Sequence, residues 1–357
     1  MKEPKELPPA ETALEVGDSV AVDEPSRRPT MVEVALEAGV SQTTVSLVLN
    51  DARGARLSSE TRRRVTEAAR QLGYRVAAKN PAGGVSIGIV AFVVDEISTD
   101  PWMALAMDGV RDKCWENGIS VVTAATRGDA EIEQAVMRQV GGQSLIGLIY
   151  GAINTRCIES FDLPRHIPTV LLNCYLGDRS LPSVVPAEVV GGHTATDRLI
   201  AAGHKRVAFI NGEAGMEASR DRLKGYRQAL ASADLKFDPA LVLHGNWEPS
   251  SGYEHTRALM ALKPRPTAIF CGNDLMALGS YEALKELNLR IPDDVAIVGY
   301  DDREIARYMR PPLTTVLLPH YEMGVVAAEY LIDEAARPIS RPTQIKVEGR
   351  LVERQSV

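Results

Sequence analysis

Eight short apolar runs alternate with amphipathic helical patterns through most of this chain, from Val85 onward. Each run has the length of a strand and is bounded by turn residues, which is typical of strands buried on both faces of a parallel sheet. The number of runs is too large for one small sheet, so we expect two doubly wound α/β lobes. The predicted strands are Ile87–Val94, Ile119–Ala125, Leu145–Tyr150, Thr169–Asn173, Val207–Asn211, Leu241–His244, Ala268–Cys271 and Val295–Gly299.

Polar and aromatic side chains follow several of these strands directly. Ligands of parallel α/β folds bind beyond the carboxyl ends of the strands, so these side chains are candidates for a ligand site. They are Asp95, His244, Trp247, Asn273, Asp274, Tyr300, Asp301 and Asp302, with Phe92 and Glu96 as further candidates near the first strand. Carboxylates and amides bind hydroxyl groups, and an indole covers an apolar sugar face or a base. Helix capping is an alternative role for Asn273 and the aspartates, and it stays open here.

A separate pattern of short helices precedes this body, between residues 30 and 74. Thr30 and Glu33 form a capping box, and Gly39 suits the left-handed end of a first helix. Ser41 caps a second helix. Helical spacing predicts that Val32, Ala35, Leu36, Val45, Val48 and Leu49 are buried. The same spacing predicts that Gln42, Thr43, Ser46 and Leu47 point outward, where Gln and Thr side chains can read base edges in a major groove.

The charge distribution agrees with contact between this module and phosphates. The whole chain carries a net charge of −7, but positions 25–85 hold ten basic residues against five acidic ones. Ser58 caps a third helix, and Arg62, Arg63 and Arg64 open it, placed for a sugar-phosphate backbone. A basic module on an acidic body is typical of nucleic-acid binding, with an ordinary solvated helix face as the alternative. Residues 1–24 are acidic and are expected to form a disordered tail.

Several function classes lack their sequence signals. No window is apolar for eighteen residues, so no membrane span is expected, and residues 1–24 do not resemble a signal peptide. The four scattered cysteines have no metal-type spacing and are expected to stay reduced in the cytoplasm. The sequence also lacks a phosphate loop, a nucleophile elbow and catalytic histidine spacing. We therefore expect no enzyme activity, no metal and no cofactor.

Two segments, VEVALEAGVSQTTVSLVLN and LSSETRRRVTEAARQLGY, resemble the DNA-binding headpiece of the LacI/GalR family of bacterial transcriptional regulators. The resemblance continues through AAGHKRVAFING, FCGNDLMALG, IPDDVAIVGYDD and LVERQS, and it covers residues 30–356. It implies an all-α helix-turn-helix headpiece on a periplasmic-binding-protein-like body of two lobes. The implied DNA contacts are Thr30, Ser41, Gln42, Thr43, Thr44, Ser46, Leu47, Asn50 and Arg62. The implied effector contacts are Arg222, Trp247, Asn273 and Asp301. Asp95 and Phe92 are added because they lie at the carboxyl end of the first strand.

The resemblance also implies a domain order. A headpiece at 25–75 and a linker at 76–86 precede an effector-binding and dimerisation domain at 87–357. Lobe one is expected at about 87–187 plus 317–335, and lobe two at about 188–316 plus 336–357, with crossings near 187–189, 316–318 and 334–338. The linker departs from the family because it is short and contains Pro81, so a hinge helix and a flexible tether both stay open. Ala187 stands where relatives usually carry aspartate, with Glu188 beside it.

The function implied is that of a cytoplasmic, homodimeric regulator, with a tetramer left open. It binds double-stranded operator DNA under the control of a small-molecule effector, and repression is favoured over activation. A sugar is the first expectation for the effector, because Trp, Arg, Asn and Asp side chains suit a polyhydroxylated ring. A nucleobase or nucleoside is the alternative. A sugar-binding receptor without a DNA role is a remote alternative, since it would not need residues 30–74.

Overall fold

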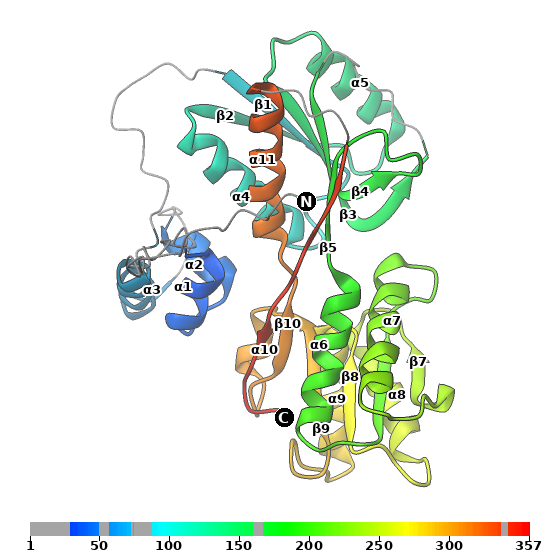
Figure 1. The fold of residues 1–357 in the computed structure, drawn as a ribbon. Coiled ribbons are helices and arrows are strands. Elements are labelled where there is room, and N and C mark those ends of the chain that lie inside the picture. Colours follow the sequence, from blue (N-terminus) through cyan, green and yellow to red (C-terminus); the bar gives the residue numbers. More distant parts are fainter. Residues whose placement is uncertain (1–28, 50–56, 73, 75–87, 160–166, 337–341) are drawn as a thin grey trace, which may run out of the picture.

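The computed structural model describes residues 29–49, 57–72, 74, 88–159, 167–336 and 342–357. The predicted acidic tail, the linker and Asn50 lie outside these residues. The described chain has a small helical bundle, here called the headpiece, and two lobes stacked one above the other (Figure 1). The headpiece consists of α1 Met31–Glu37, α2 Gln42–Leu49 and α3 Ser59–Leu72.

Lobe one has a parallel sheet of strand order β11-β5-β4-β3-β1-β2. Its strands are β1 Gly88–Val94, β2 Ile119–Ala125, β3 Gly147–Ile158, β4 Thr169–Leu176, β5 Ser183–Pro186 and β11 Gln344–Val347. Its helices are α4 Trp102–Glu116, α5 Ala130–Gly141 and α11 His320–Ala336. Successive residues of β1 face opposite sides: Val90 and Val94 pack against α4 and α11, whereas Ala91 and Val93 lie in the cluster with α5.

Lobe two repeats the arrangement with strand order β12-β10-β9-β8-β6-β7, antiparallel only at the β10–β12 edge. Its strands are β6 Val207–Asn211, β7 Val242–His244, β8 Ala268–Cys271, β9 Ala296–Asp301, β10 Thr314–Leu317 and β12 Leu351–Val352. Its helices are α6 Glu188–Ala201, α7 Glu217–Ser232, α8 Pro249–Met260, α9 Asp274–Glu286 and α10 Ile305–Tyr308, with a 3-10 turn at Pro239–Leu241. The predicted fold class is confirmed.

One predicted crossing is wrong. The chain was expected to enter lobe two near 334–338, but β11 pairs with β5 in lobe one, and only β12 joins the sheet of lobe two. The last crossing therefore lies between Val347 and Leu351. No single helix of the described part is long and apolar enough to cross a membrane, and α1 and α2 satisfy that criterion only jointly, as a pair bent by 103°.

Candidate functional site

A cavity of about 470 Å³ lies between the two lobes, where the strands of both sheets end. Its walls come from both lobes and from the crossing segment that precedes α11. Ion pairs and hydrogen bonds join the lobes beside it: Arg303 Nη2 lies 2.5 Å from Asp100 Oδ1, and the hydroxyl of Tyr175 donates to Glu217 at 2.5 Å. The lobes are therefore closed around this cavity, which we call the cleft.

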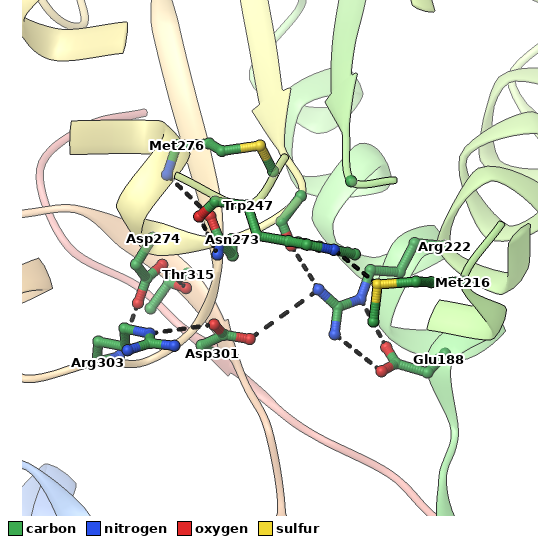
Figure 2. Close-up of polar contacts among 12 residues, drawn as sticks. Glu188, Met216, Arg222, Trp247, Asn273, Asp274, Met276, Asp301, Arg303 and Thr315 are labelled. Atoms are coloured by element: carbon green, nitrogen blue, oxygen red, sulfur yellow. Dashed lines mark hydrogen bonds and ion pairs between the residues drawn. The ribbon is translucent and has the colours of Figure 1, made fainter. Parts of the chain in front are cut away.

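Arg222 is the central cation of the cleft and comes from the buried face of α7. Its Nε and Nη2 atoms each lie 2.8 Å from a carboxylate oxygen of Glu188, and its Nη1 donates to the carbonyl of Gly272 at 2.5 Å. The guanidinium stacks on Tyr300 at 3.7 Å from the ring centre (Figure 2 shows Glu188 and Asp301 on either side of it). Burial alone would lower the pKa of Arg222, but the Glu188 carboxylate outweighs burial and raises it. Arg222 is therefore a fixed, charged platform.

Asp301 ends β9 and faces the same space. Its Oδ1 atom lies 4.0 Å from Arg222 Nη1, and its Oδ2 atom lies 3.4 Å from Arg303 Nε. Burial raises the pKa of Asp301 to about 7, against the opposing effect of the two arginines. Its φ of 111° is unusual for a residue with a side chain, and strained backbone of this kind is concentrated at binding sites. The carboxylate can accept a hydrogen bond from a ligand hydroxyl when it is ionised.

Trp247 forms a wall of the cleft from the loop after β7. Its φ is 67°, its Nε1 donates to Met216 Sδ at 2.9 Å, and its ring lies 5.4 Å from the guanidinium of Arg222. The close approach of this ring requires glycine at position 212, because a Cβ there would lie 1.9 Å from the indole. Asn273 fixes the loop, since its Nδ2 donates to the carbonyl of Trp247 at 2.9 Å. Its Oδ1 also caps α9 by accepting from Met276 N at 2.8 Å, so the capping role holds for Asn273 alongside its place in the cleft wall.

A stacked pair, Trp102 and His320, also lines the cleft, and its ring centres lie 5.6 Å apart. His320 is 1% exposed, and neither ring nitrogen has a hydrogen-bond partner among the described residues. Burial lowers the pKa of His320 to about 3, with Arg222 acting in the same direction. The ring is therefore neutral and offers one donor and one acceptor to a ligand. Neither residue was predicted from the sequence, although each follows a proline just after a strand end or a crossing.

The headpiece helices form as predicted at their ends. Thr30 and Glu33 complete the capping box, Gly39 has a φ of 59°, and Ser41 Oγ accepts from Thr44 N at 3.1 Å. Leu36 was expected in the core and is 44% exposed instead, because Met31, Val34 and Ala35 already fill the inner face of α1. The buried face of α1 is therefore turned slightly from the face that helical spacing predicted.

Part of the outer face of α2 is covered by lobe one. The headpiece lies against α4 and α11 of lobe one (Figure 1), and Gln42 and Ser46 are only 5% and 4% exposed. The Nε2 atom of Gln42 lies 3.3 Å from both carboxylate oxygens of Glu322, and the hydroxyl of Ser46 donates to Asp108. Both side chains point away from the headpiece core, as predicted, but lobe one covers them, because helical spacing within the headpiece cannot reveal a contact with a distant part of the chain.

The surface of the lobes that contacts the headpiece, which includes Glu322 and Asp108, is here called the docking face. Further contacts extend it. The hydroxyls of Tyr74 and Tyr321 lie 3.1 Å apart, and Tyr321 donates to Asp112 at 3.1 Å. Val32 packs with residues of β10 and β12, at the edge of the sheet of lobe two. The docking face therefore includes residues of both lobes, so a movement of one lobe against the other would disturb it.

Comparison with known proteins decides the family. The model of the lacI family of bacterial regulatory proteins matches residues 30–76, and a periplasmic binding protein-like domain matches residues 196–357. The ribose operon repressor of Escherichia coli strain K12 is 33% identical over 339 residues, which cover 92% of this chain and 99% of the relative. The chain belongs to the LacI family. Its predicted class, a DNA-binding transcriptional regulator with an effector-binding body, is confirmed.

Solved structures agree with this membership. The complex of the regulator CelR with cellobiose is 31% identical, with a TM-score of 0.63, and covers 92% of this LacI-family chain and 100% of its own. The lac repressor dimer bound to operator and an anti-inducer is 25% identical, with a TM-score of 0.63, and covers 92% and 99%. The PurR repressor of Edwardsiella ictaluri is a further relative, 31% identical over 335 residues that cover 92% and 96%.

Two predicted effector contacts of this LacI-family protein lie elsewhere. Phe92 is fully buried in the core of lobe one, since both faces of β1 are covered by helices. Asp95 accepts from Ile153 N at 2.8 Å and pairs with Arg156 at 2.8 Å, so its carboxylate holds β1 to β3 rather than facing the cleft. His244 is exposed and lies outside the cleft wall.

The remaining aspartates of the strand ends are structural. Asp274 accepts from the hydroxyl of Thr315 and from Arg303 N, and Asp302 pairs with Arg354 at 2.6 Å. Asp274 is fully buried, and burial raises its pKa well above the ordinary value, with Asp301 contributing further. Of these three aspartates, Asp301 is therefore the one that faces the cleft, and Asp274 and Asp302 hold the surrounding segments in place.

Proposed function

We propose that this protein is a transcriptional repressor whose hold on operator DNA is set by an uncharged sugar in the cleft. The observation that carries the proposal is the cleft itself, which two indole rings line together with Arg222, Asn273 and Asp301. Indole faces cover the apolar face of a sugar ring, and the polar groups match its hydroxyls. Relatives named as ribose operon repressors and a structure containing cellobiose support a sugar.

A nucleobase is the second candidate for the effector. The same indole rings can stack on a purine, and the neutral imidazole of His320 can bond to a base edge as well as to a hydroxyl. PurR repressors are also among the relatives. A thermal-shift screen of sugars, nucleobases and nucleosides separates the two candidates, because a ligand of the native state raises the melting temperature by mass action.

For DNA recognition we propose that Gln42, Thr43, Ser46 and Leu47 read base edges, with Thr30, Ser41, Thr44, Asn50 and Arg62 at the backbone and the helix ends. Thr43 and Leu47 remain partly exposed, whereas Gln42 and Ser46 are covered by the docking face. The headpiece must therefore leave α4 and α11 before α2 can enter a major groove. Two headpieces of a homodimer would then read half-sites about one helical turn apart.

The first turn of α11 offers a route from effector to headpiece. His320 faces the cleft, and the next two residues, Tyr321 and Glu322, contact Tyr74 and Gln42. On α4, Trp102 lines the cleft and Asp108 contacts Ser46. We propose that a ligand seated against the stacked pair of Trp102 and His320 shifts α4 and α11 and changes how firmly the headpiece docks. The ligand acts by binding one arrangement of the two lobes more tightly than another.

The test uses the full chain and duplexes selected by it from a random pool. Anisotropy of a selected duplex at two salt concentrations, with and without each stabilising compound, should show steep salt dependence and a change in affinity with effector. Absence of any sequence enrichment would remove the repressor proposal. Reporter expression in the presence of the protein distinguishes a repressor from an activator. We further propose a cytoplasmic location, where operator DNA lies, and no catalytic role.

A further inference from the structure

The feature of the cleft that most limits its ligands is the carboxylate of Glu188. We infer that Glu188 restricts the cleft to uncharged effectors by occupying the anion-binding side of Arg222. This inference rests on the proposed effector role of the cleft and specifies the chemical class of its ligand. Sugar phosphates, sugar acids and nucleotides are excluded, and neutral sugars are accepted.

The geometry of the pair carries the first step. Glu188 opens α6, is 4% exposed, and receives parallel hydrogen bonds of 2.8 Å from Nε and Nη2 of Arg222. This paired geometry is the one in which a guanidinium binds a phosphate or a carboxylate most strongly. The third donor, Nη1, is directed to the carbonyl of Gly272. A ligand anion would have to displace an internal carboxylate that is already well placed.

The second arginine of the cleft is engaged in the same way. Arg303 lies 2.5 Å from Asp100 and 3.4 Å from Asp301, so each arginine in the described cleft wall has a carboxylate partner. The wall also holds Glu213 and Glu248, which form no ion pair among the residues described. Carboxylates therefore outnumber arginines in the described cleft wall. An anion entering the cleft would lose its hydration and meet repulsion, which is how a site rejects a competing ligand.

The experiment compares Glu188→Gln with Glu213→Gln in the full chain. Both substitutions remove one negative charge from the cleft wall and keep the shape of the side chain, but only the first frees the Arg222 fork. Binding of inorganic phosphate, ribose 5-phosphate and glucuronate is followed by thermal shift and by quenching of tryptophan fluorescence. Ribose, glucose and cellobiose serve as the neutral set.

We expect the wild-type protein to respond to a neutral sugar and not to the anions. Glu188→Gln should gain at least about tenfold in affinity for phosphate or for an anionic sugar, and Glu213→Gln should gain much less. A purely structural ion pair would change stability without this gain. Equal gains in both variants would reduce the effect to general charge and overturn the inference.

The wild-type comparison does not depend on either variant folding. A wild-type protein that binds ribose 5-phosphate or glucuronate as tightly as a neutral sugar overturns the role of Glu188. The failure of the proposed function gives a different result, in which no sugar binds the wild-type protein. In that case phosphate binding by Glu188→Gln still supports the inference, and its absence refutes it.

Discussion

An internal carboxylate binds a functional side chain both in the cleft and where the headpiece meets the docking face, but the two contacts differ in strength. In the cleft, Arg222 is charged, buried and bound by Glu188 through two bonds of 2.8 Å. On the docking face, the neutral amide of Gln42 lies 3.3 Å from the oxygens of Glu322. Breaking a buried ion pair costs several kcal/mol, whereas a neutral donor contributes about 1–3 kcal/mol even to a charged acceptor. The cleft is thus preformed, and the headpiece contact is releasable.

The largest effect is expected for Arg222→Ala. The substitution leaves the Glu188 carboxylate buried without its partner, so the free energy of unfolding should fall by about 3–5 kcal/mol. The change in DNA affinity on addition of effector should also disappear. Urea unfolding followed by circular dichroism measures the loss, and Arg220→Ala, an exposed residue of the same helix, is the matched control. A loss below about 1 kcal/mol would mean that the ion pair is not the rigid element described above.

The proposed contact between Gln42 and a base edge is tested by Gln42→Ala. Specific DNA binding should weaken by about 1–3 kcal/mol per half-site, because paired hydrogen bonds to a base are lost. Non-specific binding should not fall, since removing Gln42 also removes its contact with Glu322 and eases release of the headpiece. Anisotropy with a selected and a scrambled duplex measures both. An equal loss on the two duplexes would count against base recognition by Gln42.

The pH dependence of effector binding tests Asp301. Its pKa is raised to about 7 by burial, so the carboxylate is mostly protonated at pH 6 and mostly ionised at pH 8. A sugar hydroxyl that donates to the ionised form should bind about tenfold more tightly at pH 8 than at pH 6. Titration calorimetry across this range measures it, and Asp301→Asn should flatten the profile.

Asp301 also affects the free energy of unfolding, which should fall as pH rises, whereas effector affinity should increase. Because the folded protein holds this proton more tightly than the unfolded chain, the contribution of Asp301 to the free energy of unfolding is present at low pH and is lost as pH rises through about 7. Urea unfolding of the wild-type protein and of Asp301→Asn over the same range should differ in that direction. A wild-type protein that gains stability relative to Asp301→Asn as pH rises would contradict the raised pKa.

The smallest effect is expected for Glu322→Gln. The substitution weakens one contact of the docking face, so DNA affinity in the absence of effector should rise about threefold, on selected and random duplexes alike. The control is Glu329→Gln on the same helix, which pairs with Lys113 and not with the headpiece. Unchanged affinity in Glu322→Gln would show that docking does not compete with DNA.

The sequence predicted most strands but missed one end of each sheet. Apolar runs such as β1 and β9 were found, whereas β5, β10, β11 and β12 were missed because polar residues or proline limit their apolar runs and because the pairs β5–β11 and β10–β12 join segments far apart in the sequence. The last crossing was misplaced for the same reason, since β11 was not recognised as a strand of lobe one.

Site residues were predictable where they follow a strand end and not where they depend on packing between distant segments. Trp247, Asn273 and Asp301 lie in the cleft wall as the strand rule suggests. Phe92 was misplaced because β1 is buried on both faces, so its sequence does not show which residues reach the cleft. The Trp102–His320 pair joins residues more than two hundred positions apart, and the Gln42–Glu322 contact joins residues 280 apart. No local pattern encodes either pair.

The seated headpiece also affects the regulator's search through the chromosome. Random duplex vastly outnumbers operators, and any exposed basic headpiece would be sequestered on it. With Gln42 and Ser46 turned toward Glu322 and Asp108, a docked molecule cannot insert α2 into a major groove, although Arg63 and Arg64 of α3 stay exposed. We therefore expect a docked molecule to touch random duplex through phosphates alone, which is a weak contact at physiological salt, and to leave irrelevant positions quickly.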